Sequence, residues 1–205
     1  MIDLQSINAI IFDLGNVIYD IRYENISDQF RKFGVVDFDK LYSQAGQTEE
    51  IDLFEEGKIS PARFRNYIRS LTDVPLTDEQ IDQGWNAIMI DIPECRIEML
   101  KRLQQQYRVF LFSNTNQINC EYFTQYVIDK FGYNIFNHHF EKAYYSHTLQ
   151  IKKPKPEAFQ RIIEENHLDP AKTLFIDDIE RHLKGAQSVG LRTYHHAAGN
   201  ICDFF

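Results

Sequence analysis

The stretch IIFDLGNVIYD, residues 10–20, contains the pattern that decides the fold of this chain. Apolar residues lead directly into Asp13, and Gly15 follows two positions later. A short apolar run without polar alternation is typical of a strand that is buried on both faces. We therefore expect residues 8–12 to form a central parallel strand with Asp13 at its carboxyl end.

The rest of the chain alternates between similar apolar runs and helical patterns. The expected strands are residues 108–112, 172–176 and 191–194. The expected helices are residues 93–106, 156–167 and 179–190. Two of these helices begin with proline, which suits the first helical position, and the third ends at a glycine, which suits a helix stop. This alternation predicts an α/β fold, a doubly wound parallel sheet covered by helices on both sides.

Residues 21–92 interrupt this alternation. They show no clear buried strand and instead contain several helical patterns, one of which starts at Ser60 and Pro61. We expect a helical subdomain at 21–92, inserted into an α/β core formed by residues 1–20 and 93–205. Trp85 and Tyr42 are the inserted aromatic residues that we consider for contact with the organic part of a ligand.

Composition narrows the classes of partner. The net charge of −8 argues against nucleic acid, because a phosphate backbone requires clustered lysine and arginine. No apolar run approaches the roughly 20 residues of a membrane span, and residues 1–12 do not resemble a signal peptide. The three cysteines form no disulfide framework in the sequence. We expect a reduced, cytoplasmic protein.

Polar residues follow three of the expected strands. Asp13 ends the first, Ser113 the second, and Asp177 with Asp178 the third, while Lys153 precedes a proline-started helix. Each of these residues alone is typical of a cap, a turn or a solvated surface. In open parallel sheets, however, ligands bind at the carboxyl ends of the strands. Their shared position predicts one site.

The order of these motifs resembles that of the haloacid dehalogenase-like (HAD) hydrolase superfamily. The motifs are FDLGNV with Asp13, FSNTN with Ser113, KPKPEAF beginning at Lys153, and DD at 177–178 followed by GA. The resemblance covers nearly the whole chain and implies a Rossmann-like core with a helical cap inserted after the first motif. Within the superfamily, the chain looks most like bacterial sugar-phosphate phosphatases, one of which hydrolyses α-D-glucose 1-phosphate.

The resemblance implies phosphate hydrolysis through an aspartyl-phosphate. Asp13 is then the nucleophile, Lys153 balances charge and binds the phosphate, and Ser113 and Asn114 bind the phosphate oxygens. These roles are consistent with the chemistry of phosphoryl transfer, which depends mainly on positioning the reactants and on neutralising the negative charge distributed over the phosphoryl oxygens. The expected substrate is a small phosphorylated metabolite.

The same resemblance implies a Mg²⁺ ion. Its expected ligands are Asp13, the backbone carbonyl of Gly15, and Asp178, with Asp177 binding directly or through a water. Carboxylates on adjacent strand ends repel one another without a cation. This favours a metal site over the alternative that each aspartate only caps a helix.

Gly15 departs from the superfamily pattern, because most of its phosphatases carry an aspartate there that protonates the leaving oxygen. General acid catalysis of this kind is typically worth about 10² to 10⁴ in rate. Three interpretations remain open: a substrate whose leaving oxygen needs little help, such as an anomeric phosphate; another proton donor, with Asp20 and His182 as candidates; or an inactive protein. We favour the first, with a proton from solvent or from the cap.

Two other functions fit parts of the pattern. A 2-haloacid dehalogenase also uses an aspartate and a lysine but needs no metal, so the pair Asp177 and Asp178 argues against it. A non-catalytic binding module would not need Asp13, Ser113 and Lys153 together. The oligomeric state and the role of the terminal GNICDFF (199–205) stay open at this point.

Overall fold

The computed structural model describes residues 4–36, 38 and 48–205. Its centre is a five-stranded sheet in the order β5-β4-β1-β6-β7, and every pair of neighbours is parallel. The strands are β1 (Ala9–Phe12), β4 (Arg108–Ser113), β5 (Lys142–Tyr145), β6 (Thr173–Asp177) and β7 (Arg192–His195). The predicted α/β fold and its four expected strands are confirmed.

The apolar run of β1 is continuous because both faces of this strand are covered. Ile10 and Phe12 belong to one apolar cluster, and Ala9 and Ile11 belong to a second cluster on the other side of the sheet. Ile10, Ile11 and Phe12 are fully buried. The strand therefore lies at the centre of the molecule, which fixes the position of the residue that follows it.

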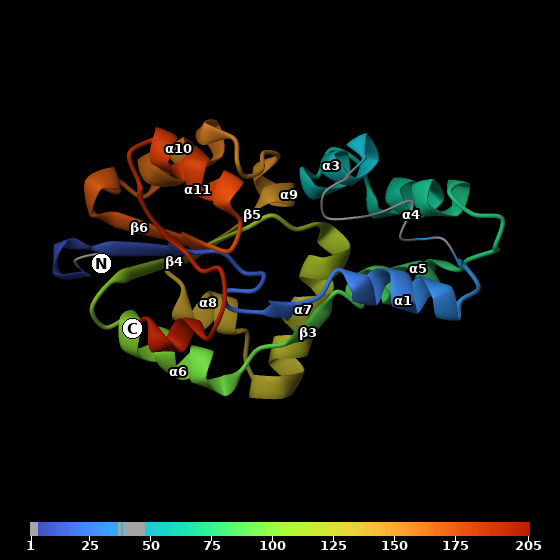
Figure 1. The fold of residues 1–205 in the computed structure, drawn as a ribbon, viewed down its shortest axis with the longest axis horizontal. Helices are drawn as coiled ribbons and strands as arrows, with labels where there is room; N and C mark the ends of the chain where they lie inside the picture. The colour runs from blue at the N-terminus through green and yellow to red at the C-terminus, as the bar shows by residue number, and fades with distance from the viewer. Residues whose placement is uncertain (1–3, 37, 39–47) are drawn as a thin grey trace.

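Helices form a layer on each face of the sheet (Figure 1). One layer contains α6 (Glu94–Leu103), α7 (Gln117–Phe131) and α8 (Ile135–His139). The other contains α9 (Ser146–Leu149), α10 (Pro156–Glu165) and α11 (Glu180–Ser188). Three 3-10 turns complete the described core: Leu4–Ser6, Pro170–Lys172 and Ile201–Asp203. No helix in the described part of the chain is both long and apolar enough to cross a membrane.

The helical segment between β1 and α6 has its own apolar cluster. Its helices are α1 (Glu24–Lys32), α3 (Glu49–Glu55), α4 (Pro61–Ser70) and α5 (Asp78–Asn86). Phe64 stacks on Phe54 at 4.1 Å between ring centroids and meets Trp85 edge-on at 4.7 Å. Trp85 is thus mainly a core residue of this segment, whereas Tyr42 lies outside the described residues.

Two antiparallel strands connect the helical segment to the core. They are β2 (Asp20–Ile21) and β3 (Met89–Asp91), which pair with each other. Neither strand is buried, so the expectation that residues 21–92 hold no clear buried strand agrees with the structure, although it gave no sign of this pair. These strands are only two and three residues long, and such lengths leave no periodic pattern to detect.

The helical segment is also joined to the core through α3. The Lys152 ammonium lies 2.5 Å from Asp52 and 2.7 Å from Glu55, and Lys155 pairs with Glu56. The Ser146 hydroxyl donates to the Glu55 carbonyl at 2.6 Å. We call the two lysines and their three acidic partners the α3 clamp.

Candidate active site

The carboxyl ends of β1 and β6 bring three acidic side chains together. Asp13, Asp177 and Asp178 each offer a carboxylate oxygen, and these oxygens all lie within 4.8 Å of one another. Asp13 and Asp177 are buried, and Asp178 is half-buried. The three carboxylates that were expected at strand ends therefore form one cluster.

Lys153 lies in the middle of this cluster, although it comes from a loop rather than a strand end. Its ammonium donates to Asp13 at 2.6 Å, to Asp177 at 2.7 Å and to the Phe112 carbonyl at 3.0 Å. Its side chain is fully buried. Burial alone would lower the pKa of Lys153, but Asp13 and Asp177 raise it above its ordinary value, so the ammonium stays charged.

One ammonium does not balance three carboxylates. Burial raises the pKa of Asp13 to about 8; Lys153 opposes this rise, and the neighbouring Asp177 and Asp178 add to it. Burial also raises the pKa of Asp178, although a hydrogen bond from Asn16 partly offsets it. The three carboxylates therefore cannot all ionise easily beside one ammonium, and a further cation would favour their ionised forms.

Asp177 has a different environment from the other two carboxylates. Its side chain is completely buried and accepts hydrogen bonds from Lys153, from the Ile179 backbone N–H at 2.8 Å and from His182 Nδ1 at about 3.0 Å. Burial opposes its ionisation, but Lys153 and His182 hold its pKa below the ordinary value. Asp177 is thus an ionised group that orients Lys153, and its oxygens already have protein partners.

Ser113 is the last residue of β4 and Asn114 follows it, and both line the same hollow as Asp13, Lys153 and Asp178. The Asn114 side chain accepts from the Lys153 backbone N–H and donates to the Lys153 carbonyl, both at 2.9 Å. This pair of hydrogen bonds holds the lysine loop against β4. The Ser113 hydroxyl has only a long contact of 3.4 Å to the Asn114 carbonyl, which leaves its donor available to a ligand.

The structure adds residues that sequence reasoning missed. Asn16 donates to Asp178 at 3.1 Å and accepts from the Ile21 backbone N–H at 3.2 Å, with φ of 55°. Asparagine tolerates this left-handed conformation better than most residues. The asparagine directly after Gly15 was therefore the one feature of the sequence that could have indicated a turn here. Gln150, just ahead of the lysine loop, also has a positive φ, of 58°. Tyr23 and Arg181 line the hollow as well.

The two candidates for a replacement proton donor are both engaged in other contacts. Asp20 pairs with Arg96 at 2.7 Å, and it lines neither this hollow nor the one beside it. His182 lines the catalytic hollow, but its Nδ1 is bonded to Asp177. Both side chains therefore have structural roles. Neither offers a proton at the place where the side chain of an aspartate at position 15 would lie.

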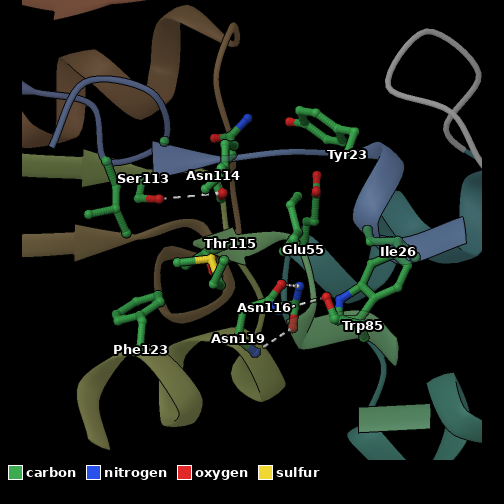
Figure 2. A pocket seen from close by; sticks show the side chains of 15 residues that line it. Tyr23, Ile26, Glu55, Trp85, Ser113, Asn114, Thr115, Asn116, Asn119 and Phe123 are labelled. Carbon is green, nitrogen blue, oxygen red and sulfur yellow. Dashed lines mark hydrogen bonds between the residues drawn. The ribbon is translucent and has the colours of Figure 1, made fainter. Parts of the chain in front are cut away.

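A second hollow adjoins the first and shares Tyr23, Glu55 and Asn114 with it (Figure 2). It is partly apolar and partly polar. Its further lining includes Ile26, Trp85 and Ile88 from the helical segment and Thr115, Asn116, Asn119 and Phe123 from the core. The site thus has a charged end at the carboxylates and a mixed end between the two parts of the chain.

The donor set at the charged end suits a hard divalent cation. Carboxylate oxygens are the ligands that Mg²⁺ prefers, and the ion would offset the unbalanced negative charge. Asp13 and Asp178 line the hollow and can offer oxygens to it, and the backbone of Gly15 borders it. The residues present therefore fit such an ion.

Comparisons with known proteins agree with this geometry. Residues 7–190 match the family model described as haloacid dehalogenase-like hydrolase. The chain is 31% identical over 193 residues to a D-ribitol-5-phosphate phosphatase of Bacteroides thetaiotaomicron, and the match covers 94% of this chain and 93% of that protein.

Solved structures show the same likeness. A wild-type HAD family enzyme of Bacteroides thetaiotaomicron, crystallised with magnesium and inorganic phosphate, is 34% identical with a TM-score of 0.82, covering 92% of this chain and 93% of that one. A predicted HAD-like hydrolase of Porphyromonas gingivalis is 26% identical with a TM-score of 0.79, covering 93% and 91%. The chain therefore belongs to the haloacid dehalogenase-like hydrolases.

Proposed function

We propose that this chain is a Mg²⁺-dependent phosphatase that hydrolyses a small sugar or sugar-alcohol phosphate through an aspartyl-phosphate on Asp13. The observation that carries the proposal is the convergence of Asp13, Asp177 and Asp178 around the Lys153 ammonium. The relatives support it, because one is named as a phosphatase of D-ribitol 5-phosphate and another was crystallised with magnesium and phosphate.

Asp13, Asp178 and the carbonyl of Gly15 would hold the ion, and Asp177 would contribute through a water because its oxygens already have partners. When bound, Mg²⁺ supplies the positive charge that allows a carboxylate to approach a phosphate dianion.

The residues of the chain account for the remaining chemistry. The Asp13 carboxylate forms a bond to phosphorus while the bond to the leaving oxygen breaks, and water then hydrolyses the acyl phosphate. Lys153 neutralises charge on the transferred group. The Ser113 hydroxyl and the backbone N–H of Asn114 bind its other oxygens, as at other anion sites beside a helix start.

We further propose that residues 21–92 act as a cap on the core of residues 1–20 and 93–205. The mixed hollow lies between side chains of both parts, such as Trp85 and Asn119, and has room for the organic part of a substrate. A cap in this position would exclude water from the phosphoryl group and select the leaving group.

The leaving oxygen still requires a proton, and we assign its donor to Tyr23, a residue of the cap. Tyr23 lines both hollows, and Figure 2 shows its hydroxyl end on the side of the ring that faces Asn114, a residue that also lines both. Burial raises its pKa, and Glu55, Asp178 and Asp13 raise it further, so the phenol stays protonated. A phenol is a weaker acid than a carboxylic acid, so the preferred substrates would be those that leave most easily, such as glucose 1-phosphate.

The test is phosphate release from a panel with Mg²⁺ and with EDTA. The panel contains glucose 1-phosphate, glucose 6-phosphate, D-ribitol 5-phosphate and p-nitrophenyl phosphate. We expect turnover that EDTA abolishes and that favours the anomeric and aryl esters. Chloride release from a 2-haloacid in EDTA would instead identify a dehalogenase, and Mg²⁺ binding without turnover of any ester would identify a binding module.

A further inference from the structure

The C-terminal residues 199–205 are packed against the core rather than projecting from it. Ile201 is fully buried in the cluster on the α6 side of the sheet. The Phe204 ring stacks on Tyr194 at 3.9 Å between centroids, and Phe205 lies 5.9 Å from Phe12, the residue before Asp13. The C-terminus consequently runs beside α6 (Figure 1).

This packing brings two cysteines together that are far apart in the sequence. Cys95 lies in the first turn of α6, and Cys202 lies in the 3-10 turn of the tail. Asn200 connects them, because its Nδ2 donates to Cys95 Sγ at 3.5 Å and its Oδ1 accepts from the Cys202 backbone N–H at 3.2 Å. Both cysteines also line one surface hollow.

The two thiols differ in reactivity. Asn200 and Cys202 lower the pKa of Cys95, and Arg96 lowers it further. Cys95 is also exposed and close to a helix N-terminus, where a thiolate is favoured. Burial raises the pKa of Cys202 to about 11, so this thiol stays protonated. An exposed, activated thiol beside a protonated one is the usual arrangement of a peroxide-sensitive pair.

We propose that Cys95 and Cys202 form a redox modification site, at which a hydroperoxide converts the two thiols into a reversible disulfide. With hydrogen peroxide, the Cys95 thiolate attacks one peroxide oxygen and the O–O bond breaks, which gives a sulfenic acid and hydroxide. The hydroxide takes up the proton that the Cys95 thiol had lost to solvent and becomes the first water. Cys202 sulfur then attacks the Cys95 sulfur, the S–O bond breaks, and the hydroxyl leaves with the Cys202 proton as the second water. The two thiols lose two electrons and two protons, and the peroxide is reduced.

The test treats the full-length protein with stoichiometric hydrogen peroxide, blocks free thiols, and identifies cross-linked peptides by mass spectrometry. We expect a peptide pair joined at Cys95 and Cys202 that dithiothreitol releases. Cys120→Ser is the matched control and should still form it, because Cys120 is the remaining cysteine and lies on α7. Cys202→Ser should stop at a sulfenic acid on Cys95, which dimedone traps.

Further measurements keep the proposal refutable. The cross-link should raise the melting temperature of the oxidised protein, and Cys95→Ser should abolish this rise, because the bond ties the tail to α6. Oxidation of Cys95 to a sulfinic acid without any cross-link would overturn the proposal. So would a disulfide found only between two molecules, or equal peroxide reactivity at Cys120.

Discussion

Gly185 on α11 offers the sharpest test of how the fold positions Lys153. A Cβ atom at this position would lie 2.9 Å from the carbonyl carbon of Pro154, closer still to its carbonyl oxygen, and 3.1 Å from the Phe159 ring. Ordinary contacts of this kind begin at 3.4 Å. Gly185→Ala should therefore push the backbone that follows Lys153 away by roughly 1 Å, since the obstacle is main chain and not a flexible side-chain end.

The size of the effect follows from the contacts of the displaced lysine. Overpacking of this kind costs about 1–3 kcal/mol, which a domain stable by about 5–15 kcal/mol survives. The Lys153 ammonium is held by contacts of 2.6 and 2.7 Å to two carboxylates, so a shift of this size breaks at least one of them. A misplacement of about 1 Å can cost 10²-fold in rate, and we expect kcat to fall by about that factor.

The assay compares phosphate release with urea unfolding for Gly185→Ala and for the control Gly132→Ala. Gly132 ends α7 with φ of 82°, and a methyl group added to it would meet no other atom within 4 Å. Alanine there strains the backbone by about 1 kcal/mol but moves nothing near the site. Wild-type kcat in Gly185→Ala, or an equal loss in both variants, would refute the reasoning.

Three more predictions concern single side chains. Asp13→Asn should abolish turnover but leave the unfolding free energy without metal unchanged or higher, because it removes one of three crowded carboxylates; loss of folding, or wild-type turnover, would contradict this. Tyr23→Phe should reduce kcat for alkyl phosphates more than for p-nitrophenyl phosphate, with exposed Tyr122→Phe as control; an equal reduction would exclude proton donation. Burial lowers the pKa of His139 to about 4, so on acidification the unfolded state takes up a proton on this histidine before the folded state does. The unfolding free energy should therefore fall as pH drops from about 6.5 to 4, by at most about 3 kcal/mol. Urea titrations should show a smaller fall in His139→Gln, and an unchanged fall in this variant would contradict the assignment.

The central strands could be predicted from sequence because those strands are apolar on both faces. β5 escaped prediction, since this edge strand is the four residues KAYY with an exposed lysine at its start.

The acidic residues at the site were predictable because strand order alone places Asp13 and Asp177 at one edge. The supporting contacts were not, because an asparagine such as Asn16 or Asn114 has no sequence mark that identifies its partner. The proximity of Cys95 and Cys202 likewise depends on how residues 199–205 fold back on α6. No local sequence pattern predicts the course of that segment.

The α3 clamp has a consequence for how this protein opens. Lys152 and Lys155 hold α3, and Lys153, which lies between them in sequence, holds the carboxylate cluster. A short stretch of backbone is thus anchored at once to α3, with its C-cap residue Glu56, and to the buried carboxylates. If the cap proposed for residues 21–92 opens, withdrawal of α3 would pull on the same stretch of backbone that holds the Lys153 ammonium 2.6 Å from Asp13. Cap position and the placement of the Lys153 charge would then be coupled through this one loop.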